Sequence, residues 1–205
     1  EFKYVNAGIG GTTSQFGVAR AQDDLLDAEP DFVIAEFSVN DESTGHFEET
    51  YEGLVRKILS SKSHPALMLV HNVCYNNGAS AELVHSRIAR HYNIPSVSMQ
   101  STLYKALLNC RFDNRRITPD DLHPNDCGHE LVSMVITKRL EQIKNMVRAE
   151  YETAKSQRAT AQPDAGAAAL LPEPLTANAY EDSVRYQNYN STPELESFKP
   201  DMSEQ

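Results

Sequence analysis

Apolar positions in the first 150 residues fall into two patterns, short continuous runs and segments with helical spacing. The continuous runs predict strands, and the longer ones are typical of strands buried on both faces. Apolar residues three and four positions apart predict helices. The predicted strands are residues 2–5, 32–37, 66–73 and 96–99. The predicted helices are residues 14–27, 47–59, 80–92 and 100–108, with a last helix beginning at Asn125 or Asp126.

This alternation of strands and helices has a consequence for the fold. Strands joined through helices form a parallel sheet with right-handed crossovers, and the helices cover both of its faces. The sequence therefore predicts an α/β protein. In such sheets ligands bind beyond the carboxyl ends of the strands, so polar residues that directly follow a strand are the first candidates for a site.

The pattern changes near residue 150, which sets the expected domain organisation. We predict one α/β domain over residues 1–150. Residues 151–178 are rich in Ala, Gln and Pro and predict a linker. Residues 179–205 carry scattered aromatic side chains without helical spacing, and predict either a tail or the start of a further domain.

Composition and charge exclude several classes of function. The net charge is −10, and residues 151–205 hold four basic and nine acidic side chains. An acidic chain without a Lys/Arg cluster argues against nucleic acid as a partner. The three cysteines are widely spaced, which indicates neither a disulfide framework nor a zinc site and fits a cytoplasmic protein. The sequence contains no apolar run of about 18 residues, so it predicts no membrane span.

Three stretches that follow predicted strands carry candidate chemistry. Asp120 lies three residues before His123, a spacing at which the carboxylate can hold one ring nitrogen and leave the other free as a base. A glycine turn that contains Gly11 lets backbone N–H groups approach a substrate. Asn40 ends an apolar run, and its amide can donate a hydrogen bond to an oxyanion.

Each of these stretches also has a simpler interpretation. The glycine turn is compatible with a purely structural turn or a phosphate site, although Thr13 stands where a G-x-G-x-x-G motif needs its last glycine. Asn40 and Asp41 both favour turns by bonding to local backbone. The Asp120–His123 pair is compatible with a solvated loop. His123 and His129 have no third ligand nearby, so we predict no metal site.

Taken together, the three stretches resemble blocks of the SGNH (GDSL-type) hydrolase family. The glycine turn is similar to the second block, with Gly11 at the position of the oxyanion-hole glycine. Ser38 to Asp41 is similar to the third block, with Asn40 as the oxyanion-hole asparagine and Ser38 in place of the usual glycine. Asp120 and His123 match the acid and base of the fifth block.

The resemblance covers residues 1 to about 147 and implies a fold and an activity. The fold would be a flavodoxin-like three-layer α/β/α sandwich. The activity would be that of a serine esterase on short acyl esters, acetyl above all, with carbohydrate as a possible carrier and with no cofactor. In family members of similar layout a sugar-binding β-domain follows the catalytic one, and residues 179–205 are compatible with its beginning.

One departure concerns the nucleophile. The first block, Gly-Asp-Ser, is missing, and Ser183 lacks the preceding strand and glycine. We therefore expect that the first strand and its serine lie upstream of residue 1, and that residues 1–205 alone are inactive. Two alternatives stay open, a lysophospholipase or thioesterase of the same family and a non-catalytic module with an SGNH-like shape that binds a ligand.

Overall fold

A computed structural model describes residues 2–158, 171–187 and 191. Within these ranges a three-stranded parallel sheet in the order β1-β2-β3 lies between helices. The strands are β1 (Phe32–Ala35), β2 (Ala66–His71) and β3 (Ser96–Ser98). The α-helices are α1 (Ser14–Asp24), α2 (Gly45–Leu59), α3 (Glu82–His91), α4 (Lys105–Leu108) and α5 (Asp126–Arg158). Short helical turns are η1 (Leu26–Ala28), η2 (Gln100–Tyr104) and η3 (Asn114–Arg116).

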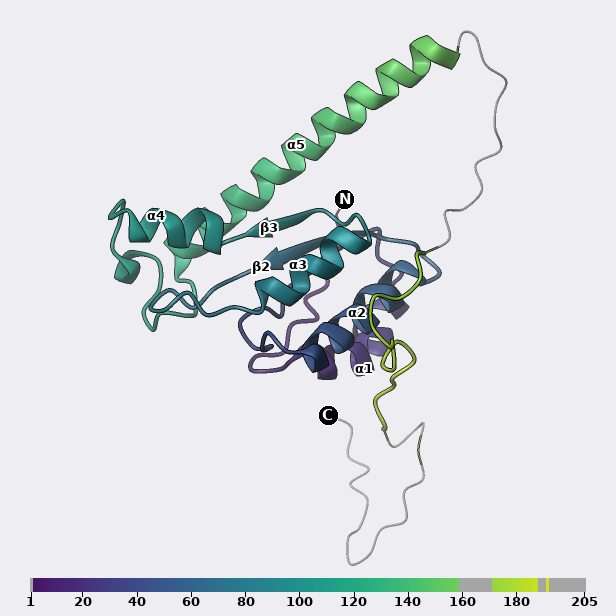
Figure 1. Ribbon diagram of the computed structural model, residues 1–205, viewed down its shortest axis with the longest axis horizontal. Coiled ribbons are helices and arrows are strands. Elements are labelled where there is room, and N and C mark those ends of the chain that lie inside the picture. The colour runs from purple at the N-terminus through teal and green to yellow at the C-terminus, as the bar shows by residue number, and fades with distance from the viewer. Residues whose placement is uncertain (1, 159–170, 188–190, 192–205) are drawn as a thin grey trace, which may run out of the picture.

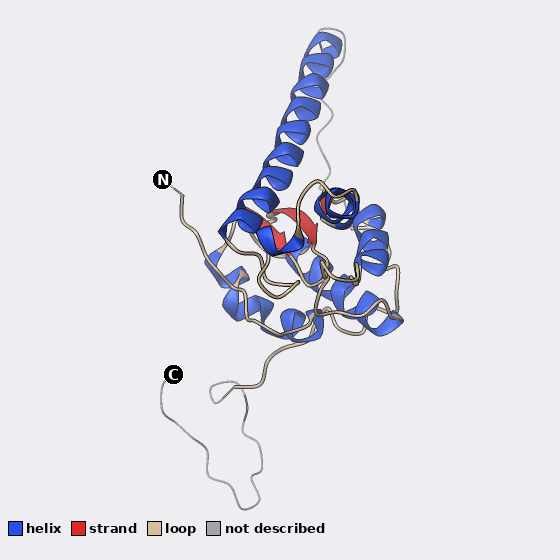
Figure 2. Ribbon diagram, turned by 90° about the vertical axis from the view of Figure 1, so that its left-hand side faces the viewer, coloured by secondary structure: helices blue, strands red, loops and turns tan. Residues whose placement is uncertain are grey.

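Two hydrophobic clusters hold this sheet in a three-layer α/β/α arrangement, as predicted (Figures 1 and 2). On one face, Val33 of β1 and Leu69 of β2 pack with α1, α2 and α3. On the other face, Val70 of β2 and Val97 of β3 pack with η2 and the first turns of α5. Alternate residues of β2 thus enter opposite cores, which explains why its sequence reads as a continuous apolar run.

The register of the strands brings the carboxyl ends of β1 and β2 to one edge. Ile34 pairs with Met68, and Val70 pairs with Val97. Asn40 lies in the loop after β1, residues 72–81 form the loop after β2, and η2 follows β3. This edge is where the sequence pattern places the candidate chemistry.

The predicted strand at residues 2–5 is wrong. These residues have no regular structure, and Phe2 and Tyr4 are exposed. A strand forms only where a neighbour satisfies its backbone groups, and among the described residues β1 pairs with β2 alone. The apolar character of the segment was therefore not sufficient evidence for a strand.

The last helix begins where the sequence predicts. The side chain of Asn125 accepts a hydrogen bond from Gly128 N at 3.0 Å, which caps the helix. α5 then continues to Arg158, into the range predicted as a linker, and extends beyond the sheet (Figure 1). Residues 171–187 pack against α2. The predicted division at residues 150 and 178 stays a prediction, and most of residues 188–205 lie outside the described ranges.

Candidate active site

The Asp120–His123 pair lies in the loop between η3 and α5. Asp120 Oδ2 is 2.7 Å from His123 Nδ1. Asp120 Oδ1 accepts hydrogen bonds from the backbone N–H groups of Leu122 at 3.1 Å and His123 at 2.8 Å. One carboxylate therefore folds the short loop and orients the imidazole at the same time, because three residues are just enough for the chain to turn back on the carboxylate.

The electrostatics of this pair keep the carboxylate ionised. The hydrogen bond from His123, followed by those from the two backbone N–H groups, lowers the pKa of Asp120 well below its usual value. An ionised Asp120 accepts from Nδ1, which leaves Nε2 as the unprotonated nitrogen of a neutral ring. His123 Nε2 has no hydrogen-bond partner in the described part of the chain, and the side chain is 77% exposed. Nε2 is thus available to accept a proton.

The loop of the pair is fixed to its surroundings on both sides. Tyr75 N donates to Asp121 O at 2.7 Å, which ties the loop to the segment after β2. Asn125 N donates to Ile117 O at 2.9 Å. A Cβ on Gly128 would come within 2.2 Å of that same Ile117 oxygen, so only glycine allows α5 to begin so close to the loop.

The glycine turn leads into α1 and is open to solvent. Gly11 has φ +69°, a left-handed conformation that favours glycine. Apart from Gly11 and its two neighbours in the chain, no atom lies within 4 Å of the place of its absent Cβ. Its N–H group has no hydrogen-bond partner among residues 2–158 and 171–187. This N–H group is therefore free to bind an anionic oxygen.

Asn40 lies in the turn that follows β1. The turn closes through hydrogen bonds to Phe37 O from Asn40 N at 3.1 Å and Asp41 N at 2.9 Å. The side chain of Asn40 is exposed and makes no hydrogen bond with the described residues. Its amide is thus not consumed by turn formation and remains a free donor.

Asp41 connects the two loops that carry these donors. Its Oδ1 accepts from Ser14 N, the first residue of α1, at 2.8 Å. Its Oδ2 lies 3.0 Å from Nε2 of the buried His85 in α3. Sequence reasoning missed this role, since Asp41 was interpreted only as a turn residue and its partners lie 27 and 44 positions away.

Further hydrogen bonds continue this connection along the sheet edge. Ala81 N donates to Ser38 O at 2.6 Å, and Ser38 Oγ donates to Asn72 O at 3.0 Å. These bonds tie the loop of Asn40 to the segment after β2, which itself contacts the loop of His123 through Tyr75. The loops of Gly11, Asn40 and His123 are therefore joined by one continuous hydrogen-bonded framework.

The described residues contain no group of three or more His, Cys, Asp or Glu side chains placed to hold a metal ion. Within the same ranges, none of the helices combines the length and the apolar character that crossing a membrane requires.

Comparisons with known proteins agree on one family. Residues 1–131 match the GDSL-like lipase/acylhydrolase family. The thioesterase 1/protease 1/lysophospholipase L1 of Escherichia coli K12 is 26% identical over 152 residues, which are 69% of this chain and 68% of that protein.

Solved structures give the same result. A two-domain esterase active on acetylated mannans, co-crystallised with mannopentaose, is 59% identical with a TM-score of 0.79; the match covers 93% of this chain and 46% of that one. This chain thus spans about half the length of that esterase. An acetyl-xylooligosaccharide esterase from Geobacillus, 18% identical with a TM-score of 0.56, shares the fold; the match covers 64% of this chain and 69% of that one.

Proposed function

Since this chain belongs to the GDSL-like lipase/acylhydrolase family, we propose that it carries the catalytic base, its carboxylate partner and two oxyanion donors of a serine esterase. The observation that carries this proposal is the Asp120–His123 pair with Nε2 free, in a loop that hydrogen bonds connect to the loops of Gly11 and Asn40. The described residues thus supply four groups that one acyl-transfer site needs.

In the proposed mechanism, His123 Nε2 takes the proton of a serine hydroxyl as the oxygen attacks the ester carbonyl. Asp120 stabilises the imidazolium that forms, since the ionised carboxylate lies 2.7 Å from Nδ1. The imidazolium then gives the proton to the leaving alcohol. Water attacks the acyl-enzyme in the same way, with His123 again as base, and releases the acid.

The negative charge of the tetrahedral intermediate falls on the former carbonyl oxygen. We propose that Gly11 N–H and the Asn40 amide bind this oxygen. Both groups lack partners among the described residues, so neither must break a bond to do so. Donors held in place before the reaction need no reorganisation, and each is worth about 3 kcal/mol of transition-state stabilisation.

The nucleophile is proposed to lie outside residues 1–205, on a strand that pairs with the free edge of β1. In the described part of the chain β1 pairs with β2 only, which leaves its other edge open. Phe32 and Ile34 are 43% and 47% exposed, so the face opposite α2 is also uncovered at β1. Parallel strands with such apolar faces are normally covered and paired.

For the substrate, we propose an acetyl ester on a mannan-type saccharide. The support is the 59% identity to an esterase active on acetylated mannans, which is far above the identity to the thioesterase/lysophospholipase. The free and exposed Nε2 of His123 is compatible with a large, hydrophilic acyl carrier at the surface.

The test is intact-mass labelling of the full-length protein with a fluorophosphonate, which reacts only with an activated serine. We expect one adduct in the wild type and none in His123→Ala, with both proteins folded by circular dichroism. The absence of an adduct on the folded wild type would contradict the esterase proposal and favour a non-catalytic module.

The substrate is tested separately, by acetate release from acetylated mannooligosaccharides compared with hydrolysis of a lysophospholipid and an acyl-thioester. Faster turnover of the acetylated saccharide is expected. Labelling by the probe together with turnover of the lipid or thioester alone would keep the serine hydrolase and replace the substrate class.

A further inference from the structure

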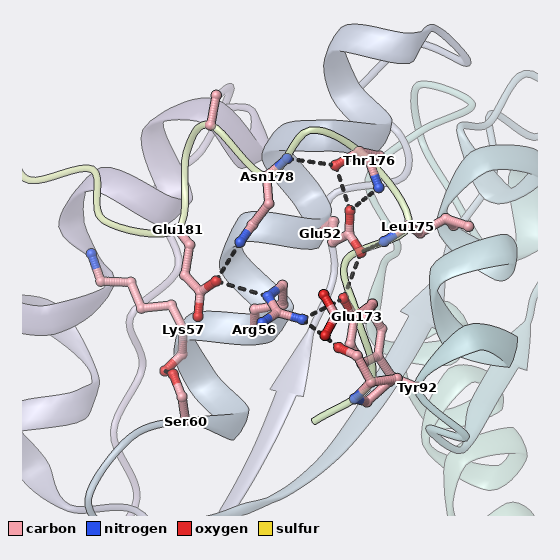
Figure 3. Close-up of polar contacts among 12 residues, drawn as sticks. Glu52, Arg56, Lys57, Ser60, Tyr92, Glu173, Leu175, Thr176, Asn178 and Glu181 are labelled. Carbon is pink, nitrogen blue, oxygen red and sulfur yellow. Dashed lines mark hydrogen bonds and ion pairs between the residues drawn. The ribbon is translucent and has the colours of Figure 1, made fainter. Parts of the chain in front are cut away.

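Residues 171–187, here called the strap, comprise the end of the predicted linker (residues 171–178) and the first part of the predicted tail or further domain, and they pack against the helical layer of α1, α2 and α3 (Figure 3). The strap contains no helix or strand. It begins beside the end of α3, where His91 Nε2 donates to Glu173 O at 2.7 Å. It ends beside α1, where Arg185 lies 3.2 Å from Asp24 and Gln187 donates to Asp23 at 2.6 Å.

The central contact of the strap is Glu52 of α2, which is fully buried. Glu52 Oε1 accepts from Leu175 N at 2.6 Å and from Tyr92 Oη at 2.5 Å. Its Oε2 accepts from Thr176 N at 2.7 Å and from Thr176 Oγ1. Three of these four donors belong to the strap. A buried carboxylate is costly unless hydrogen bonds compensate its desolvation, so the strap supplies most of the hydrogen bonds that offset the burial of Glu52.

Two opposing effects act on the pKa of Glu52. Burial raises the pKa of this carboxyl, but the hydrogen bonds from Thr176, Tyr92 and Leu175 outweigh burial and lower it below its usual value. The hydrogen bonds of the strap therefore stabilise the charged form of Glu52.

Arg56 lies one turn after Glu52 on the same face of α2 and holds two distant points of the strap. Arg56 Nε donates to Glu181 Oε2 at 2.7 Å, and both side chains are largely buried. Its Nη1 donates to Pro172 O at 2.8 Å. The guanidinium thus closes the strap into a loop over α2, as Figure 3 shows.

Gly53 lies between these two charged residues and gives the strap room. A Cβ at this position would come within 3.0 Å of Glu181 N and of the carbonyl carbon of Tyr180, both backbone atoms. Tyr180 in turn packs against the core of α1, α2 and β1. Glycine inside a helix is unfavourable for the helix itself, and here it permits a close approach between backbones.

We propose that Glu52, Gly53 and Arg56 form a docking surface for this chain's own residues 171–187, so that the strap is a fixed part of the hydrolase domain and not a flexible tether. The surface is complementary to the strap in three respects. Arg56 pairs with the charge of Glu181, and Glu52 accepts the hydrogen bonds that the strap donates. Gly53 leaves room for the strap backbone. A consequence is that the last residues of the strap, Arg185 and Gln187, are held at a constant place beside Asp23 and Asp24 at the end of α1. The inference does not depend on the reaction proposed above.

The test is hydrogen–deuterium exchange of the full-length protein, read on peptides from the strap and from β2. The variants Glu52→Gln, Gly53→Val and, on the strap itself, Thr176→Val each remove one part of the docking contact. The matched control is Glu29→Gln, which removes an exposed ion pair with Lys62 and no contact to the strap.

In the wild type we expect the strap amides to exchange much more slowly than those of an unstructured peptide. The three variants should accelerate this exchange by about tenfold or more, while β2 is unaffected and the control matches the wild type. Exchange of the wild-type strap at unstructured rates would overturn the proposal. It would also be overturned if Glu52→Gln and Gly53→Val accelerated β2 while Thr176→Val left the strap unchanged, because the surface would then serve only the core.

Discussion

Asp41 Oδ1 and Ser14 N are joined by a buried hydrogen bond of 2.8 Å. Asp41 directly follows Asn40, and Ser14 begins the helix that follows the turn of Gly11. The bond therefore sets the position of one proposed oxyanion donor relative to the other. His85 fixes the second carboxylate oxygen at 3.0 Å, so Asp41 is held from two elements at once.

We predict that Asp41→Ala lowers kcat about 10- to 100-fold with a smaller change in KM, because misplaced donors weaken binding of the transition state more than that of the substrate. Asp41→Asn should retain most of the activity. Its oxygen can still accept from Ser14 N, and its amide can donate to His85 in the other tautomer. Steady-state kinetics on an acetyl ester measure both, and an Asn variant as impaired as the Ala variant would contradict this explanation.

Asn40→Ala removes a donor whose side chain makes no bond with the described residues. Folding should therefore be unchanged, whereas kcat should fall about 100-fold or more with little change in KM. Thermal unfolding and kinetics of the same preparation test this prediction. A rise in KM alone would assign Asn40 to substrate binding instead of the oxyanion hole.

Asp120→Asn should leave the loop folded, since the remaining side-chain oxygen can still accept from Leu122 N and His123 N. The new amide nitrogen would face His123 Nδ1 and donate to it. The ring would then carry its proton on Nε2 and could not act as the base, so we expect kcat to fall by roughly 10³- to 10⁴-fold. The ¹⁵N chemical shifts of His123 report the tautomer directly. Full activity of this variant would exclude Asp120 as the partner of the base.

Local features of this site could be predicted from the sequence, and distant ones could not. Asp120 and His123 are three residues apart, so their contact follows from a short loop, and the cap at Asn125 is equally local. The catalytic roles themselves remain predictions. The strand predicted at residues 2–5 failed because apolar side chains show that a segment can pair, but not that a neighbour is present.

The contacts of the strap could not be predicted from the sequence, for a related physical reason. Its residues 171–178 lie in the predicted linker, and residues 179–187 lie in the predicted tail or further domain. Composition indicates how much apolar surface a segment can bury, and residues 151–178 have little. The strap binds instead through its backbone N–H groups, which every sequence has, to a carboxylate 123 positions away. Hydrogen bonding between segments so far apart leaves no periodic pattern in the sequence. The two segments become neighbours only in the folded chain.

From the burial of His71 at the end of β2 we predict that the free energy of unfolding decreases in acid. Burial, with a smaller contribution from the nearby His85, lowers the pKa of His71 from 6.5 to about 4. Because the unfolded chain takes up this proton at higher pH than the folded one, stability is complete above about pH 6.5 and falls as the pH decreases through about 4. The loss is on the order of 3 kcal/mol.

His71→Leu should remove this part of the acid sensitivity. Both ring nitrogens are buried and lack a partner in the described residues, so the apolar side chain costs little at neutral pH. Urea unfolding at pH 7 and pH 4.5 compares the variant with the wild type, and His129→Leu at an exposed position is the control. An equal drop in stability for His71→Leu and the wild type would mean that His71 is not the titrating group.

Gly128→Ala tests whether the start of α5 holds the loop of the proposed base. Its Cβ would lie 2.2 Å from Ile117 O, so the helix or the loop must move, and we expect a destabilisation of about 1–3 kcal/mol. Gly45→Ala is the matched control, because nothing lies within 4 Å of its Cβ and alanine favours the helix, with a gain of up to about 1 kcal/mol. Denaturant unfolding measures both changes. Since the displaced loop carries His123, Gly128→Ala should also lower kcat when assayed well below its unfolding temperature, whereas an unchanged kcat in a destabilised variant would show that the loop keeps its position without this contact.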